Sequence, residues 1–231
     1  MSLLKCNNLT KAYGNYTAIK DINLELTEGK IIGLLGPNGS GKTTLIKCIN
    51  RLLAPTKGSI EVCGKVPGPE TKALISYLPD QNSLPDWMKV RDLIGMYQDF
   101  FADFDPKRAY DMLQSLQIDY NVQFKKMSKG TKEKVQLILV MSRRAKLYLL
   151  DEPIAGVDPA TRDFILNTII NNYDENATVI ISTHLISDIE NVLDEVIFLK
   201  EGNIILHQSA DQIRQETNKS IDEYFREVFR C

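Results

Sequence analysis

The chain has 231 residues, of which 43% are apolar and 25% charged, and its formal net charge is −2. This balance is typical of a globular domain, and it gives no sign of a basic surface for nucleic acid. Apolar runs such as 135–141 are far shorter than the roughly 20 residues of a membrane span. The N-terminus does not resemble a secretory signal. We therefore expect a cytosolic protein, for which any membrane role must come through a partner.

The cysteines and histidines show no metal-ligand spacing. The cysteines include no C-x-x-C pair, and the two histidines are too few for a metal cluster. We expect buried or incidental thiols rather than a disulfide or a zinc site. The residues concerned are Cys6, Cys48, Cys63, Cys231, His184 and His207.

The first third of the chain reads as strands around one glycine-rich stretch. Alternating apolar and polar residues predict antiparallel strands at 2–9 and 17–26, joined through 11–16. An apolar run at 31–35 predicts the strand that precedes the glycine-rich stretch. The pattern then predicts a helix at 42–53, a strand at 59–63, a loop at 67–69 and a strand at 74–78.

The glycine-rich stretch has the spacing G-x-x-x-x-G-K-[ST]. Its glycines let the backbone curl so that successive N–H groups point inward, and the following helix adds its N-terminal dipole. Lys42 would supply a charge to the β- and γ-phosphates, and Thr43 a hydroxyl to Mg²⁺. The stretch predicts that the chain binds a nucleoside triphosphate. Its residues are Gly36, Pro37, Asn38, Gly39, Ser40, Gly41, Lys42, Thr43 and Thr44.

Strand signals disappear between about 85 and 143 and then return. Three helical segments are predicted in this insert, at 90–101, 106–116 and 132–143. The later part predicts strands at 147–150, 178–182, 195–199 and 204–207, with helices at 160–172 and 185–191. Alternating strands and helices around a phosphate loop predict an α/β P-loop NTPase fold with a mainly parallel, doubly wound sheet. We treat 1–231 as one domain with a helical subdomain at 85–143 and a helical tail at 209–231.

The tail has an amphipathic helical pattern. Ser220 and Glu223 have the spacing of a capping box. The apolar stripe would dock on its own domain or, alternatively, on a second subunit. It consists of Ile221, Tyr224, Phe225, Val228 and Phe229.

Two carboxylates end the buried strand at 147–150. Ligands of open α/β sheets bind at the carboxyl ends of the strands, which is where Asp151 and Glu152 lie. Asp151 is suited to the Mg²⁺ shell that Thr43 begins, and Glu152 to orienting or deprotonating an attacking water. Because two carboxylates repel a triphosphate, we expect nucleotide binding to depend strongly on Mg²⁺.

A second helix start contains Ser128, Lys129, Gly130 and Thr131. Ser128 or Thr131 would cap the helix, and Gly130 allows close backbone approach, so this end suits an anion. An ordinary helix cap is the alternative.

These motifs, together with Gly156-Val157-Asp158 and with His184 after a buried strand, occur in one order. Over roughly residues 2–210 they resemble the nucleotide-binding subunit of ATP-binding-cassette (ABC) transporters. The resemblance implies a Mg²⁺-dependent ATPase that dimerises on ATP and drives a separate membrane-spanning permease, at the inner face of the plasma membrane.

The resemblance also assigns roles to single residues. Tyr13 matches the aromatic residue that stacks on adenine, and His184 the histidine that hydrogen-bonds the γ-phosphate. Asp158 matches an aspartate at the dimer seam. Residues 127–131 match the family signature, which acts on ATP held by the opposite subunit, with Ser128 and Gly130 nearest the phosphate. Each ATP would then lie between two cassettes.

Two stretches depart from the family pattern. In the signature, Lys129 replaces the first glycine and Thr131 the glutamine. Lys129 would either add charge toward ATP or point to solvent. After Pro79, Asp80 occupies the usual glutamine position, and Gln81 follows it. Either Asp80 reaches the Mg²⁺ shell through water, or a local shift brings Gln81 there.

Within the family, the chain resembles the short cassettes of bacterial exporters, including those linked to antibiotic or peptide resistance. Trp87 and Met88 lie where relatives offer a groove to the membrane subunit, with core packing as the alternative. The second cassette could be identical or different. Two other functions stay open: a soluble ABC ATPase acting on nucleic acid or ribosomes, although we expect no nucleic acid partner, and a degenerate ATP-binding partner in a heterodimeric transporter.

Overall fold

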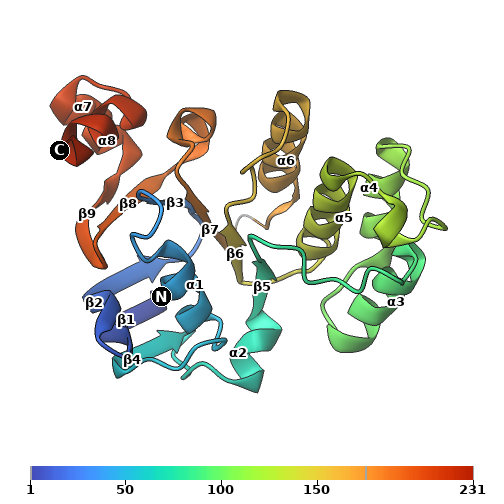
Figure 1. Ribbon diagram of the computed structural model, residues 1–231, viewed down its shortest axis with the longest axis horizontal. Coiled ribbons are helices and arrows are strands. Elements are labelled where there is room, and N and C mark those ends of the chain that lie inside the picture. Colours follow the sequence, from blue (N-terminus) through green and yellow to red (C-terminus); the bar gives the residue numbers. More distant parts are fainter. Residues whose placement is uncertain (1, 175, 231) are drawn as a thin grey trace.

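The computed structural model describes residues 2–174 and 176–230, so Cys231 lies outside the described part (Figure 1). It contains an antiparallel sheet of three strands and a six-stranded, mostly parallel sheet with helices on its faces. The predicted α/β class, with an antiparallel N-terminal region and a helical insert, is confirmed.

The small sheet has the order β2-β1-β4, in which β1 is Ser2–Tyr13, β2 is Tyr16–Thr27 and β4 is Lys57–Val62. The first two strands are longer than predicted, because the turn between them takes only Gly14 and Asn15. Gly14 has a φ of 57°, which glycine adopts without strain. The tight hairpin therefore pairs Tyr13 with Tyr16 at its end.

The large sheet has the order β5-β6-β7-β3-β8-β9, in which β9 is antiparallel to its neighbour and the other pairs are parallel. The central strands are buried along their whole length, as expected of a sheet covered on both faces. The strands are β3 (Ile31–Leu35), β5 (Ile75–Leu78), β6 (Leu147–Asp151), β7 (Thr178–Thr183), β8 (Glu195–Lys200) and β9 (Asn203–Ser209).

Helix α1 (Lys42–Ile49) packs between the two sheets. Its Leu45 and Ile46 belong to a core cluster that also contains residues of β1, β2, β3 and β4. The helix was predicted to reach residue 53, and that boundary was wrong. Arg51 has a φ of 56°, in the left-handed region, so the helix ends before it.

The opposite face of the large sheet is covered by α6 (Pro159–Asn172), α7 (Ala210–Thr217) and α8 (Ile221–Phe229). The tail stripe docks on its own domain, where Phe198 of β8 contacts Phe225 edge-on at a centroid distance of 5.3 Å. Ser220 caps α8 by accepting a hydrogen bond from the backbone N–H of Glu223, as the capping box predicted.

The helical segment forms a separate cluster to one side of the sheet (Figure 1). It consists of α3 (Val90–Phe100), α4 (Pro106–Ser115) and α5 (Lys129–Met141). Met88 packs against this cluster, whereas the Trp87 side chain next to it is 70% exposed. The core alternative therefore holds for Met88 and not for Trp87.

Three further segments show the larger differences from prediction. Residues 69–74, expected to hold the end of a loop and the start of a strand, form α2 (Pro69–Leu74), with its proline at the favoured first position. The helix expected at 185–191 is two single 3₁₀ turns, Ile186–Asp188 and Glu190–Val192. Ile186 and Ile189 are both buried three residues apart, a spacing that matches the three-residue 3₁₀ turn. Helix α5 begins at Lys129 rather than at 132, because Ser128 is its cap.

No helix in the described part of the chain has the length and apolar content needed to cross a membrane.

Candidate functional site

The phosphate loop lies between β3 and α1, and its conformation requires glycine. Gly39 and Gly41 have φ values of 81° and 109°. A Cβ on Gly41 would lie 2.5 Å from the Ala18 carbonyl oxygen, and one on Gly36 would lie 2.4 Å from that of Leu199. The backbone can therefore follow this path only with glycine at these positions.

Lys42 is held over the loop and away from solvent, with a side chain that is 6% exposed. Its Nζ donates hydrogen bonds to the carbonyl oxygens of Gly36 at 2.7 Å and Pro37 at 3.3 Å. The same atom lies 3.3 Å from Oε1 of Glu152. The charge is thus fixed before any phosphate arrives, which lowers the entropy cost of binding one.

Asp151 ends β6 and is fully buried. Its Oδ1 accepts hydrogen bonds from the hydroxyls of Thr43 at 3.1 Å and Ser182 at 2.6 Å. Burial raises the pKa of Asp151, and the nearby carboxylates of Asp80 and Glu152 add to the rise, while the two hydrogen bonds oppose it. The carboxyl is therefore poised to gain stability from a nearby cation.

The residues present fit a magnesium ion. Oδ2 of Asp151 is buried and has no hydrogen-bond partner among the described residues, and the Thr43 hydroxyl lies against the other oxygen of the same carboxyl. A carboxylate and a hydroxyl are hard oxygen donors of the kind that Mg²⁺ prefers.

Glu152 begins the loop that follows β6, in an unusual backbone conformation. Its φ is 50°, which costs a residue other than glycine about 1–3 kcal/mol. Its backbone N–H donates to the carbonyl and to the hydroxyl oxygen of Ser182, both at 3.0 Å. The strand β7 next to β6 therefore holds Glu152 in this conformation.

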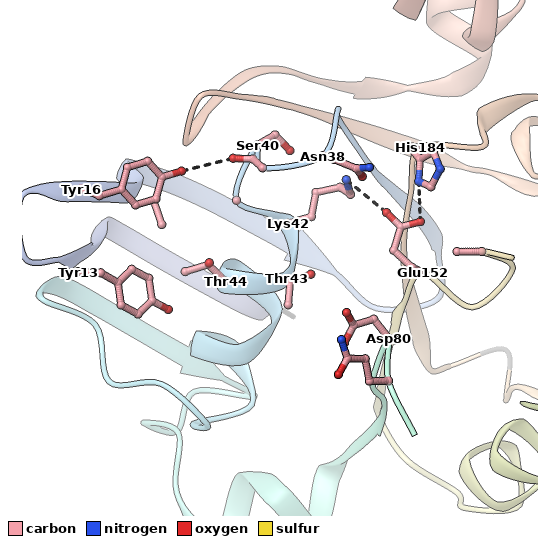
Figure 2. Close-up of a pocket in the computed structure, with 15 residues that line it drawn as sticks. Tyr13, Tyr16, Asn38, Ser40, Lys42, Thr43, Thr44, Asp80, Glu152 and His184 are labelled. Atoms are coloured by element: carbon pink, nitrogen blue, oxygen red, sulfur yellow. Dashed lines mark hydrogen bonds and ion pairs between the residues drawn. The ribbon is translucent and has the colours of Figure 1, made fainter. Parts of the chain in front are cut away.

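The Glu152 side chain connects two charged or polar groups. Oε1 faces Lys42, and Oε2 lies 3.0 Å from Nδ1 of His184, whose ring N–H donates to it (Figure 2). The Glu152 side chain is 15% exposed. Glu152 and His184, predicted as catalytic from separate motifs, are thus brought into direct contact.

These groups line one pocket of about 500 Å³. Tyr13 and Tyr16 lie on one side of it and Glu152 and His184 on the other, with Lys42 between (Figure 2). This arrangement offers aromatic faces at one end and charged groups at the other, as a nucleotide with base and phosphates would need. The lining includes the predicted residues Asn38, Gly39, Ser40, Gly41, Thr43, Thr44, Asp80 and Gln81.

Asp80 and Gln81, which follow β5, both line this pocket, so the structure brings both to the site.

The predicted signature residues lie together, but they do not line this pocket. Ser128 caps α5 by accepting a hydrogen bond from the Thr131 N–H at 3.2 Å. A Cβ on Gly130 would lie 3.9 Å from Oδ2 of Asp158, so the start of α5 adjoins the start of α6. Asp158 caps α6, and it also accepts a hydrogen bond from the Thr161 hydroxyl at 2.7 Å.

Some of the site was not predicted from sequence. Ser182 connects Asp151 to the Glu152 backbone. Its position two residues before His184, at the end of a buried strand, is the signal that could have found it. Tyr16 and Ala155 also line the pocket, and only the tight hairpin explains the position of Tyr16.

Comparison with known proteins agrees with this geometry. A sequence profile of the family described as ABC transporter matches residues 19–155. The chain is 30% identical over 217 residues to the ABC transporter ATP-binding protein YtrB of Bacillus subtilis, covering 93% of this chain and 74% of that protein. The chain belongs to the ABC transporter family.

Two further similarities extend over the whole ABC cassette. The SkfA peptide export ATP-binding protein SkfE of Bacillus subtilis is 29% identical over 237 residues, covering 100% of this chain and 97% of that protein. A solved structure of an ATP-binding subunit of an ABC transporter matches with a TM-score of 0.89 at 25% identity, covering 99% of this chain and all of that one. The protein is thus an ATP-binding, ATP-hydrolysing cassette of this family.

Proposed function

We propose that this cassette hydrolyses ATP in sites shared between two cassettes and thereby drives a separate membrane-spanning permease. One observation carries the shared-site proposal. Ser128, Gly130 and Asp158 lie together at the starts of α5 and α6, whereas the phosphate loop and Glu152 line a pocket that those three do not reach. A second cassette, identical or different, would bring its own cluster to this pocket.

The pocket residues have separable tasks in hydrolysis. The phosphate loop and Lys42 bind the triphosphate, and the faces of Tyr13 and Tyr16 receive the base. Glu152 orients the attacking water and accepts its proton, while His184 fixes the carboxylate and reaches the γ-phosphate. Thr43 and Asp151, with Asp80 or Gln81, would hold Mg²⁺, which neutralises phosphate charge when bound.

The hydrogen-bonded contacts of Glu152 support a competent catalyst rather than a degenerate ATP-binding partner. The carboxylate is fixed by Lys42 and His184 on its two oxygens, and its backbone by Ser182. A group held this way loses little freedom when the water binds, which favours catalysis.

We assign the permease contact to the surface around Trp87. A 70% exposed tryptophan on a well-packed helical cluster is suited to insert into, or receive, an apolar helix of a partner. The cassette would then lie at the cytoplasmic face of the membrane through its permease, with residues 1–231 acting as one domain.

We further propose that transport is outward. The full-length similarity to SkfE, whose name describes peptide export, supports an exporter. The cargo class that follows from it is a peptide or a peptide-like antibiotic.

Size-exclusion chromatography of a Glu152→Gln variant tests the shared site. With ATP and Mg²⁺ this variant should elute as a dimer, because it binds ATP and clears it slowly. A Lys42→Met/Glu152→Gln double variant, which lacks the phosphate contact, serves as the control and should stay monomeric. A Glu152→Gln protein that holds ATP and remains monomeric would overturn the homodimer, leaving a heterodimer or no shared site.

A further inference from the structure

Lys129, the lysine in the place of a signature glycine, contacts the loop that follows Glu152. Its side chain is 74% exposed, in agreement with the solvent alternative. Its Nζ nevertheless lies 3.5 Å from the carbonyl oxygen of Gly156 in the same chain. Gly156 belongs to loop 152–158, which begins at Glu152 and ends at the α6 cap Asp158. The first residue of α5 therefore reaches the segment that carries the proposed catalytic carboxylate.

The backbone of Gly156 is adapted to this contact. It has a φ of 71°, and a Cβ there would lie 3.0 Å from Lys129 Nζ. Glycine thus leaves room for the ammonium beside a carbonyl that accepts its hydrogen bond.

Glu133, one helical turn after Lys129, directs the ammonium. Its Oε1 lies 3.8 Å from Lys129 Nζ, and its side chain is 24% exposed. Oε2 of Glu133 is buried and has no partner among the described residues. A half-buried carboxylate at the i+4 position attracts the ammonium toward this side of the helix, which favours the lysine conformer that reaches the loop.

Lys129 and Glu152 also share a cavity. A space of about 330 Å³ is lined by Lys129 and Glu133 from α5 and by Asp80 and Glu152 from the strand ends. Lys129 thus lines a space that its own chain's catalytic glutamate also lines.

The other attachments of loop 152–158 come from the sheet and from α6. Ile154 and Val157 are buried in the main core, and Arg162 Nε donates to the Val157 carbonyl oxygen at 3.2 Å. Lys129 adds a hydrogen bond from the helical segment. The loop is therefore held between the sheet region, which carries the phosphate loop, and the helical segment, which carries the signature residues.

We propose that Lys129 is a positioning residue for ATP hydrolysis that acts within its own chain. It holds loop 152–158 against the start of α5, so that Glu152 is correctly oriented in a chain whose signature engages the partner's ATP. This inference rests on the proposed function, because it assumes that Glu152 is the base and that α5 contacts a second cassette. A charge aimed at the partner's ATP is the competing role.

Steady-state kinetics separate the two roles. Lys129→Met should lower kcat about fivefold and leave KM for ATP within about twofold, because exposed polar contacts have modest energies and the loss affects the chemical step. Lys129→Arg should restore most of kcat. Lys126→Met, which removes the charge of another exposed lysine three residues earlier, is the matched control and should behave as wild type.

A double-mutant cycle tests the role of Glu133. Glu133→Gln should lower kcat as well. The kcat of the Lys129→Met/Glu133→Gln variant should be no lower than that of the slower single variant, since both substitutions act through one contact. Fully additive losses would contradict this arrangement.

Hydrogen exchange provides a readout that needs no turnover. In ATP-free protein, Lys129→Met should speed amide exchange in a peptide covering residues 153–158 and leave peptides of β3 and α1 unchanged, whereas Lys126→Met should change none of them. A lysine that acts only on the partner's ATP would not alter exchange in ATP-free protein.

Three results have distinct meanings. A raised KM with unchanged kcat and unchanged exchange would overturn the inference in favour of direct ATP contact. Wild-type kinetics and exchange in Lys129→Met would overturn it in favour of a solvent role. Failure of the wild type to hydrolyse ATP would count against the proposed function, while the exchange experiment would still decide whether Lys129 holds the loop.

Discussion

The nucleotide pocket and the start of α5 differ in how their polar groups are held. At the phosphate loop, Asp151 is fully buried and the Lys42 side chain is 6% exposed, and each has several fixed partners. At the start of α5, Ser128 and Lys129 are exposed and their bonds are local caps and one loop contact. Fixed charges in the pocket are prepared for chemistry, whereas the exposed Ser128 at the start of α5 is accessible to another molecule.

This difference indicates which tests will be decisive. Substitutions in the pocket should alter ATP binding and turnover in a single chain. Substitution of Ser128 should leave ATP binding by a single chain intact and act once a second cassette is present. The following predictions probe the pocket side, from the largest expected effect to the smallest.

Glu152→Gln should reduce kcat by about 10²–10⁴-fold with little loss of ATP affinity, because it removes a general base and keeps the side-chain shape. Steady-state phosphate release and equilibrium ATP binding measure the two quantities. Glu28→Gln, at an exposed carboxylate of the β2–β3 turn, is the control and should behave as wild type. Near-normal turnover in Glu152→Gln would remove Glu152 from the mechanism.

Lys42→Met should raise the Kd for ATP about 10- to 100-fold, the effect expected from losing one charge-assisted hydrogen bond. Isothermal titration measures it. Lys47→Met, which removes a lysine later on the same helix, should change Kd by less than about twofold. Equal effects at the two lysines would show that only net charge matters.

Tyr13→Ala should raise the Kd for ATP about three- to tenfold, because it removes one stacking face, whereas Tyr13→Phe should preserve affinity. Tyr16→Ala tests whether the neighbouring ring shares this task. The same titration with a non-purine triphosphate shows whether the rings contact the base, since a smaller base stacks less. Unchanged affinity in Tyr13→Ala would place the base elsewhere.

Asp151→Asn should stabilise the protein in the absence of Mg²⁺ and nucleotide. Burial raises the folded-state pKa of Asp151 above the ordinary aspartate value of 3.8. Wild-type stability therefore falls as pH rises from the ordinary pKa through the folded-state pKa, and it stays lowered above it. The variant lacks this loss and should melt about 2–4 °C higher at pH 7.

Thermal melts from pH 4 to pH 8 measure this effect, and the advantage of the variant should shrink toward pH 4. Mg²⁺ with ATP should then stabilise the wild type more than the variant. A variant that melts lower at pH 7 would show that the hydrogen bonds from Thr43 and Ser182 outweigh the buried charge.

The sequence was sufficient to predict those parts of the site that depend on residues close together in the chain. The phosphate loop is specified by glycines a few residues apart, and Asp151 and Glu152 by one apolar strand, so their positions were predicted correctly. The cap at Ser128 was also visible, although the helix was expected to begin later.

Contacts between distant segments could not be predicted. Ser182 meets Asp151 across 31 positions, and Lys129 meets Gly156 across 27, and such pairs depend on strand order and helix placement. The end of α1 could not be predicted either. The left-handed conformation of Arg51 ends the helix, and no glycine or proline at that position indicates the end in the sequence.

The central claim, that each ATP lies between two chains, is tested most directly by mixing two inactive variants. Lys42→Met disables the phosphate loop and keeps the signature, and Ser128→Arg blocks the signature and keeps the phosphate loop. In a mixed dimer one of the two sites is intact, so random pairing should restore about a quarter of wild-type ATP turnover. If the mixture hydrolyses no more ATP than the two variants measured separately, the site is complete within one chain and the account is contradicted.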